Sequence, residues 1–473
     1  MKAPLYNYLI KYNKDITSFH MPGHKFGKAL EMEKLSLLDL DVTEVPGLDN
    51  LYDPEGIILE AQGKMALKYK AKETIFLTNG STAGIIASIM AVCSPGESLI
   101  IARNSHNSVW NGLILGGVRP IYLTPSYEEN YGILGGISPA KLEELLIAYP
   151  EAKGVLIVSP TYEGLVSNIE QIAKVVHQHK KILIVDEAHG AHFTWDRDFP
   201  KSALECGADM VIQSMHKTLP TLTQSSLLHI GSEKIDKDIV LQRLQMIQTS
   251  SPSYIMMGLM DYMRAYMEEH KHLWSEYLKY LLQAREILMQ LKNLSLLSKD
   301  ICGQADIWDV DISKIVIDTS HTNITGIELG QLLRSQYAIQ VEVEAKDYII
   351  AMSTIGDTSR DLEVLCKALL EIDAQLIPST PIKNSFNMVQ SNNRETILPR
   401  SVFGGNKEYT PIEQSEMRIS SANIMLYPPG IPLICIGERF TKEMIANIEQ
   451  CQEKLLGVIY KDGKIIVSVA QEN

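Results

Sequence analysis

The chain has 473 residues, of which 45% are hydrophobic and 21% are charged, as in a globular enzyme with more than one domain. Its net charge of −13 argues against nucleic acid or an anionic membrane as the main partner. The sequence contains neither a signal peptide nor an apolar run long enough to span a bilayer, so we expect a cytoplasmic protein.

Residues 1–55 carry dense turn signals with little hydrophobic periodicity, which predicts an arm that packs on another part of the protein. From residue 56 onward, short apolar runs alternate with helical patterns, and this alternation predicts a mainly parallel sheet between layers of helices. The clearest strand-like runs are 98–102, 120–123, 154–158, 181–185 and 209–212.

Longer helical patterns at 234–247 and 252–291 complete a large domain that we place at 56–300. A smaller α/β domain is expected at 301–376, followed by a linker at 377–381. Residues 377–473 are expected to form a C-terminal domain. The six cysteines are scattered without a C-x-x-C pair, so we expect neither a disulfide framework nor a metal site.

The segment Gly80-Ser81-Thr82 follows an apolar run and opens a helical pattern. Glycine allows close approach of a phosphate, the helix N-terminus offers N–H groups, and the hydroxyls add donors. Taken alone, the segment is more typical of a simple helix cap. Its position upstream of the residues described next favours a phosphate site. His106 ends the strand-like run 98–102 and is predicted to contact the same cofactor, although a lone histidine there is more often structural.

Asp186 and Lys217 each follow a short apolar run, at the ends of two strands that are consecutive along the chain. A pyridoxal 5'-phosphate (PLP) enzyme needs such a pair. The lysine forms a Schiff base with the cofactor, and the carboxylate pairs with the pyridinium nitrogen. Together, in this order and spacing, they favour PLP; Glu187 is the weaker alternative to Asp186.

Several polar residues near this pair are further candidates. His189 is placed to reach the cofactor oxygen or the substrate, whereas His192 has the pattern of a hydrogen-bonded neighbour. Ser214 and His216 flank the lysine and can donate to phosphate. Ser250, before Pro252, either belongs to a helix start or completes the phosphate site of a neighbouring subunit.

These segments together resemble the Orn/Lys/Arg decarboxylase family of fold-type-I PLP enzymes, in its compact form without the N-terminal domain of larger members. The resemblance runs almost from end to end of the chain. Besides the segments above, it rests on Phe19-His20-Met21-Pro22-Gly23-His24-Lys25, residues 41–51, Arg103–His106, Thr249–Pro252 and Tyr427-Pro428-Pro429-Gly430.

The resemblance implies an α/β fold like that of aspartate aminotransferase and a homodimer with shared active sites. It implies that Lys217 is the Schiff-base lysine, Asp186 the pyridinium partner and His106 the ring-stacking residue. The phosphate ligands that it implies are Ser81, Thr82, Ser214 and His216, with Ser250 from the partner subunit. The catalytic set is therefore Lys217, Asp186, His216 and His106, with Gly80 and His189 added at the cofactor.

The implied reaction is α-decarboxylation of a basic L-amino acid, with arginine or lysine ahead of ornithine. Two other PLP classes compete: α-oxoamine synthases share the Asp-Glu-Ala-His-Gly segment, and aminotransferases carry an arginine motif that residues 417–420 resemble. A carboxylate must receive the distal cation of the substrate. The candidates are Asp41, Glu44, Asp49, Asp53, Glu55 and Glu438.

Overall fold

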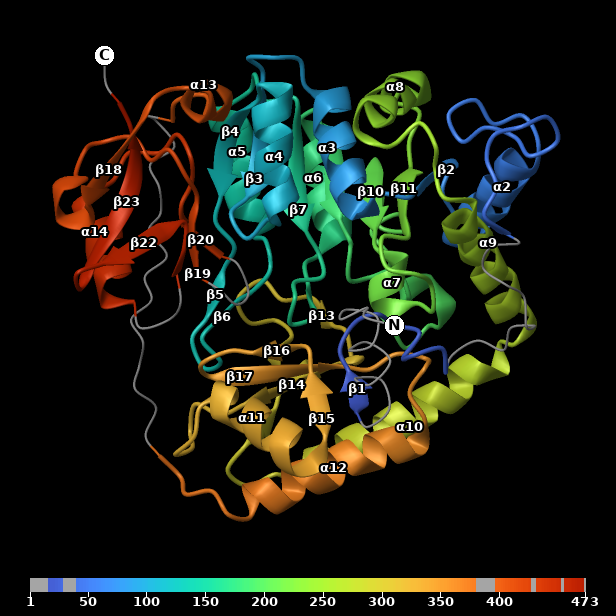
Figure 1. The fold of residues 1–473 in the computed structure, drawn as a ribbon, viewed down its shortest axis with the longest axis vertical. Helices are drawn as coiled ribbons and strands as arrows, with labels where there is room; N and C mark the ends of the chain where they lie inside the picture. The colour runs from blue at the N-terminus through green and yellow to red at the C-terminus, as the bar shows by residue number, and fades with distance from the viewer. Residues whose placement is uncertain (1–15, 29–39, 380–395, 427–430, 452–454, 472–473) are drawn as a thin grey trace, which may run out of the picture.

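The computed structural model describes residues 16–28, 40–379, 396–426, 431–451 and 455–471. Its centre is a seven-stranded sheet in the order β2-β11-β10-β9-β7-β3-β4 (Figure 1). All strand pairs in this sheet are parallel except those of β11, which runs antiparallel to both of its neighbours. The strands are β2 (Glu73–Leu77), β3 (Ser98–Ala102), β4 (Arg119–Leu123), β7 (Gly154–Val158), β9 (Ile182–Asp186), β10 (Met210–Gln213) and β11 (Ser226–Ile230).

The central strands are continuous apolar runs because helices cover both faces of the sheet. On β9, Leu183 and Val185 belong to one hydrophobic cluster, whereas Ile184 between them belongs to the other. The second cluster contains α3 (Gly80–Val92), α4 (Asn107–Gly116) and α8 (Lys237–Ile247). The first contains α2 (Ile57–Tyr69), α5 (Pro139–Ala148), α6 (Ile169–Gln178) and α9 (Tyr254–Glu269).

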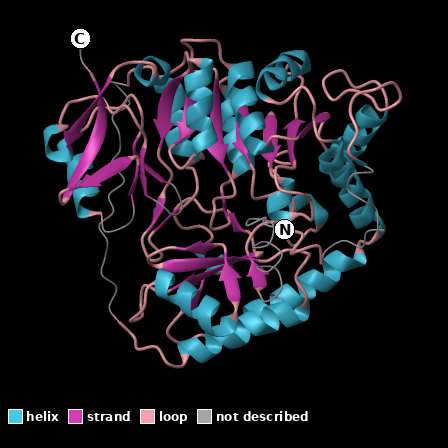
Figure 2. Ribbon diagram, viewed as in Figure 1, coloured by secondary structure: helices cyan, strands magenta, loops and turns pink. Residues whose placement is uncertain are grey.

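A smaller four-stranded sheet, in the order β12-β14-β17-β16, lies below the large one (Figures 1 and 2). The N-terminal arm contributes β1 (Thr17–Phe19), which pairs in parallel with β15 (Ile339–Val341) beside this sheet. The other elements of this part are α10 (His272–Leu288), β12 (Ser295–Leu296), β14 (Lys314–Asp318), α11 (Gly326–Tyr337), β16 (Val343–Glu344), β17 (Tyr348–Met352) and α12 (Ser359–Asp373).

The helical pattern expected over 252–291 forms two helices, because α9 ends at Glu269 and α10 begins at His272. The break falls where the packing partner changes: α9 contacts α2 of the upper part, whereas α10 contacts α12 of the lower part. Neither glycine nor proline marks the break, so the sequence pattern alone gave no sign of it.

The C-terminal region forms two three-stranded sheets with a hydrophobic cluster of their own. Its elements are α13 (Pro399–Phe403), β18 (Lys407–Pro411), β19 (Ile424–Leu426), β20 (Ile431–Ile434), α14 (Lys442–Gln450), β21 (Leu455–Leu456), β22 (Val458–Lys461) and β23 (Lys464–Ala470). Short pairs elsewhere join β5 (Tyr127–Glu128) to β6 (Ile133–Leu134) and β8 (Leu165–Val166) to β13 (Asp309–Val310). The predicted boundaries at residues 55, 300 and 376 stay predictions.

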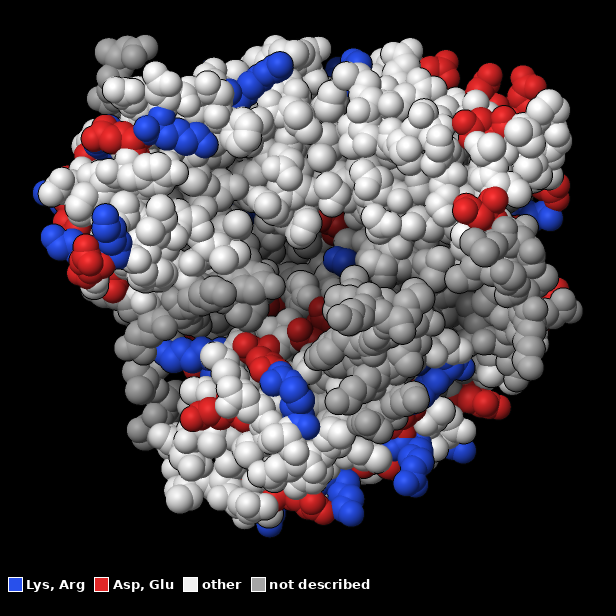
Figure 3. Space-filling view, viewed as in Figure 1, with Lys and Arg blue, Asp and Glu red and all other residues white. Residues whose placement is uncertain are grey.

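The parallel strands end at the edge of the large sheet that faces the smaller one, and ligands bind at this edge in open α/β sheets. Figure 3 shows the molecule hollowed there, with acidic and basic side chains on the floor of the hollow. None of the helices that the structure describes is both long and apolar enough to cross a membrane.

Candidate active site

Asp186 is the last residue of β9, and its side chain is 3% exposed. Within the described residues it accepts one hydrogen bond, from the Ala188 N–H to Oδ1 at 3.1 Å. Burial raises the pKa of Asp186, and the charges of Lys217 and His106 oppose this rise. A carboxylate held in the sheet with so few protein donors is suited to pair with a cation that arrives from outside the chain.

Lys217 lies in the short helix α7 (Met215–Thr218), which follows β10. Burial lowers the pKa of Lys217, although the carboxylates of Asp186 and Glu342 favour its charged form. The Lys217 Nζ lies 3.0 Å from His189 Nε2. Asp186, Lys217 and His106 thus lie at or just after the ends of β9, β10 and β3, on one edge of the same sheet, and the roles predicted for them stay predictions.

The N-terminus of α3, which we call the α3 cradle, is the predicted phosphate site. Asn79 precedes the helix but makes no side-chain cap, so no side chain occupies the first-turn N–H groups from this position. Gly80 has a φ of +70°, which favours glycine, and a Cβ there would meet nothing within 4 Å. Ser81 Oγ lies 2.6 Å from Ser214 Oγ, and Thr82 is exposed on the first turn.

For two histidines of the site, a neighbouring backbone group decides whether Nδ1 donates or accepts a hydrogen bond. The Nδ1 of His106 accepts the Ser108 N–H at 3.2 Å, and burial lowers the pKa of His106. The Nδ1 of His216 lies 3.0 Å from the Ser225 carbonyl and therefore donates to it. Each neutral ring has one donor and one acceptor nitrogen, so Nε2 of His216 is an acceptor.

His189 is 5% exposed and lies between two lysines, Lys217 and Lys314. Burial and the neighbouring cations lower the pKa of His189 well below its ordinary value, so its ring is neutral. The Tyr162 ring lies 4.6 Å from the His189 ring. Lys314 is not among the residues that the sequence predicted, because it begins an apolar strand far along the chain.

Glu342 is a second residue that the sequence did not reveal. It lies between β15 and β16, and its carboxylate accepts from the Met21 N–H at 2.8 Å and the Tyr162 hydroxyl at 2.7 Å. Its charge favours the ammonium forms of both Lys217 and Lys314. A carboxylate can accept about four hydrogen bonds, so Glu342 retains acceptor capacity towards the hollow.

The alternatives near Asp186 have structural roles. The buried carboxylate of Glu187 accepts from Ser202, Gln213 and the Ala203 N–H, and burial raises its pKa to about 7. His192 Nε2 lies 3.1 Å from Asp311 Oδ1, as expected for a hydrogen-bonded neighbour.

Glu438 is wrong as a candidate for the distal cation of the substrate. Its side chain is 3% exposed and receives two hydrogen bonds from Arg103, at 2.8 and 2.7 Å. The pair joins the C-terminal region to the end of β3. The sequence places Glu438 after a turn, where acids are usually solvated, and the arginine partner is 335 residues away in the chain.

The acids of the arm do not converge on Lys217 either. Asp49 accepts N–H groups from Asn50, Glu55, Gly56 and Ile58; burial opposes its ionisation, but these donors hold its pKa at about 2. This is the role of a loop cap. The remaining four candidates are exposed: Asp41, Glu44, Asp53 and Glu55.

Two other predicted features lie apart from this cluster. Ser250 is exposed after α8, and the adjacent Thr249 carbonyl accepts from the Tyr52 hydroxyl at 2.6 Å. Arg418, in the motif that resembles an aminotransferase, binds Glu408 at 2.7 Å within the C-terminal region. The Tyr427–Gly430 motif lies outside the described residues.

The site fits a phosphorylated pyridine ring. The uncapped helix and paired serines would hold phosphate, and buried Asp186 would hold the ring nitrogen. The hydroxyls of Thr218 and Ser225, which follow Lys217 in the chain, are buried without a partner among the described residues. The described part of the chain also holds no group of three or more His, Cys, Asp or Glu side chains that could bind a metal ion.

Comparison with known proteins identifies the family. The model described as Orn/Lys/Arg decarboxylase, major domain, matches residues 3–323, and the corresponding C-terminal domain model matches residues 386–455. The arginine decarboxylase of Bacillus subtilis (strain 168) is 33% identical, over 94% of this chain and 93% of that protein. Lysine decarboxylase LdcA of Pseudomonas aeruginosa is 24% identical, over 93% of this chain and 74% of that protein.

Solved structures show the same fold. The constitutive lysine decarboxylase of E. coli has a TM-score of 0.77 at 21% identity, covering 92% of this chain and 76% of that one. The L-threonine transaldolase of Pseudomonas fluorescens, described in an internal aldimine state, has a TM-score of 0.58 at 16% identity, covering 78% and 87%. The predicted fold-type-I α/β class is confirmed.

Proposed function

The chain belongs to the Orn/Lys/Arg decarboxylase family, and from this premise we propose that its substrate is L-arginine. It is a PLP-dependent carboxy-lyase that acts on a basic amino acid. Family membership sets aside the aminotransferase and α-oxoamine synthase alternatives. The choice among arginine, lysine and ornithine rests on the relatives.

We propose that Lys217 attaches PLP and that Asp186 pairs with the ring nitrogen. The support is their convergence at the ends of β10 and β9, with the α3 cradle alongside. We propose that Ser81, Thr82 and Ser214 hold the phosphate, with Gly80 at the turn and His106 beside the ring. His216, whose Nδ1 donates to the Ser225 carbonyl, would donate to phosphate only from a protonated ring. Bound PLP supplies an electron sink for the electrons of the cleaved Cα–carboxylate bond.

Residues of the protein must then transfer a proton to the substrate. We infer that the ammonium of Lys217 returns a proton to the substrate Cα. Nε2 of His216, an acceptor in the neutral ring, can do so only after it has itself taken up a proton. Asp186 stays ionised when it faces a cation, which offsets the burial that otherwise raises its pKa.

The arginine assignment is supported by the relatives, and Glu342 is the candidate to receive the distal cation. The chain is 33% identical to the arginine decarboxylases of Bacillus subtilis and Halalkalibacterium halodurans, against 24% for a lysine decarboxylase. Among the described residues, Asp186 and Glu342 are the carboxylates whose charges act on Lys217. With Asp186 assigned to the ring nitrogen, Glu342 is left to receive the distal guanidinium.

Replacing Glu342 by glutamine is expected to lower kcat/KM for L-arginine about ten- to hundredfold, mainly through KM. The reason is that a hydrogen bond to a charged group contributes about 1.5–3 kcal/mol, and the neutral amide weakens it. Steady-state kinetics of agmatine release would measure the effect. Glu344→Gln is the matched control, because Glu344 lies two residues away and pairs with Arg334. Equal losses in the two variants would contradict the role of Glu342.

We also propose a homodimer in which the Ser250 segment completes the partner's site. The support is that Ser250 is exposed and lies apart from the cradle of its own chain. Gln248, two residues before Ser250, nevertheless contacts the loop between β2 and α3, because its Oε1 accepts the Thr78 N–H at 2.9 Å.

A further inference from the structure

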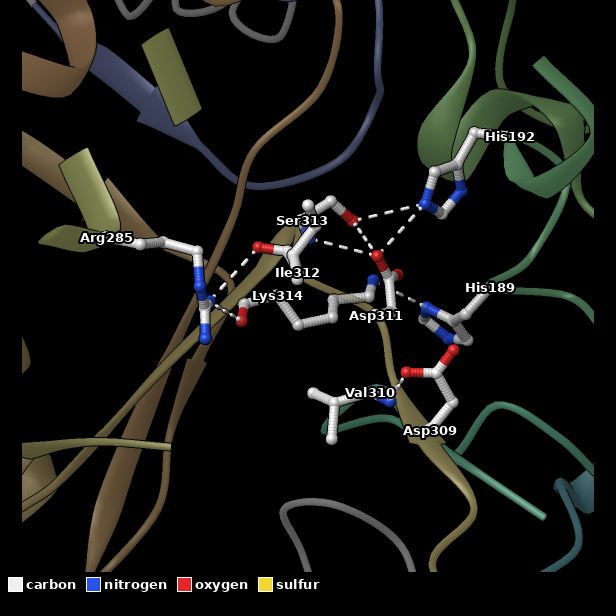
Figure 4. A network of polar contacts seen from close by, with 9 residues as sticks. All are labelled: His189, His192, Arg285, Asp309, Val310, Asp311, Ile312, Ser313 and Lys314. Atoms are coloured by element: carbon white, nitrogen blue, oxygen red, sulfur yellow. Dashed lines mark hydrogen bonds and ion pairs between the residues drawn. The ribbon is translucent and has the colours of Figure 1, made fainter. Parts of the chain in front are cut away.

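Two lysines share the imidazole of His189. The Lys217 Nζ lies 3.0 Å from Nε2, and the Lys314 Nζ lies 3.2 Å from Nδ1. Lys314 comes from β14 of the small sheet and His189 follows β9 of the large one, so their contact joins the two parts of the molecule (Figure 4). Lys314 is fully buried, and His189 is 5% exposed.

The position of Lys314 is fixed by its surroundings. Arg285 donates to the carbonyls of Ile312 and Lys314, at 3.1 and 3.2 Å (Figure 4). The preceding loop is held by Asp311, whose Oδ1 accepts from the Ser313 hydroxyl at 2.7 Å and lies 3.1 Å from His192. A lysine anchored in this way on both sides is positioned towards His189.

The count of donors and acceptors restricts the protons in this arrangement. A neutral imidazole has one N–H donor and one acceptor nitrogen, and an ammonium can only donate. His189 is neutral, so it cannot accept from two ammonium groups at once. At least one of Lys217 and Lys314 is therefore an uncharged amine while both contacts are made.

We propose that Lys314 is a positioning residue that controls the protonation of Lys217 through His189. When the ammonium of Lys217 gives a proton to Nε2, the ring gives its Nδ1 proton to the amine of Lys314. The positive charge moves from Lys217 to Lys314 and no other group changes. The amine of Lys217 that remains has the lone pair needed to react with a carbonyl.

The charges around Lys314 agree with this exchange. Burial lowers the pKa of Lys314 to about 8, with the carboxylates of Asp311 and Glu342 opposing it and the cations of Lys217 and Lys25 adding to it. An amine of this pKa can hold or release a proton near neutral pH. Lys314 also has no ion pair within 4 Å in the described part of the chain, so it is not committed to a carboxylate.

The inference rests on the proposed attachment of PLP to Lys217 but not on which amino acid is the substrate. Its test follows PLP itself. PLP is added to the full-length chain stripped of cofactor, and the absorbance of lysine-bound PLP gives the rate of attachment at each pH. A failure of the arginine assignment leaves this measurement unchanged.

Lys314→Met is expected to move the pH midpoint of attachment upward by about one unit, about a tenfold lower rate below the midpoint. Without the neighbouring cation and the exchange, the pKa of Lys217 rises and less of it is uncharged. Lys314→Arg keeps a permanent cation, so its midpoint should lie no higher than that of the wild type. This variant also carries the test if Lys314→Met does not fold.

Two comparisons separate this role from general electrostatics. Lys25 is a second buried lysine, but its Nζ donates to the carbonyls of His20 and Met352, at 3.1 and 2.8 Å. Lys25→Met should shift the midpoint much less than Lys314→Met. In a His189→Phe background, Lys314→Met should add no further shift. Equal shifts for the two lysines, or an undiminished shift without His189, would overturn the proposal.

Discussion

Lys217→Ala should abolish decarboxylation of L-arginine, with a loss of more than about 10³-fold in kcat. The variant loses the proposed attachment point for PLP and the ammonium group that is proposed to return a proton to Cα. Single-turnover assays of CO₂ release, at saturating PLP, would measure the residual rate. Turnover by Lys217→Ala at the wild-type rate would show that the reaction does not use this lysine.

Asp186→Asn should retain bound PLP but lose most activity. A neutral amide cannot favour the protonated ring nitrogen as a buried carboxylate does, and the expected rise in barrier is about 3 kcal/mol, roughly a hundredfold in kcat. The cradle at α3 is unchanged, so PLP should still bind through its phosphate. Activity within threefold of the wild type would mean that the carboxylate is wrongly assigned.

Equilibrium binding of PLP provides the control for this second variant. Absorbance titration gives the dissociation constant of PLP. Relative to the wild type, this constant should change much less than kcat does. A variant that has lost PLP altogether would indicate a structural role for Asp186, and the kinetic comparison would then say nothing of the ring nitrogen.

The central sheet and the residues that end its strands were predictable from the sequence. The buried strands are short apolar runs, and β3 and β7 have the predicted bounds. Since parallel strands end at one edge of a sheet, residues that follow them must come together there. The 2.6 Å contact between Ser81 and Ser214 is an example, although the two are 133 residues apart.

The contributions of the small sheet were not predictable in this way. Lys314 stands at the start of an apolar strand, where a lysine is usually solvated. It is buried because the start of β14 lies against the part of the molecule that carries His189. Glu342 lies between two short strands with Glu344 and Asp347 close by in the chain, and nothing local distinguishes it from them. Glu438 shows the converse error, because its partner Arg103 lies in another part of the fold.

The most direct test is a side-by-side assay of the purified enzyme with L-arginine, L-lysine and L-ornithine, measuring CO₂ and amine together. We predict that kcat/KM for arginine exceeds that for each of the others by at least about tenfold, because the chain is more similar to arginine decarboxylases than to a lysine decarboxylase. Preference for lysine or ornithine would contradict the arginine assignment. Release of CO₂ from none of the three, with PLP bound at Lys217, would contradict the proposed function itself.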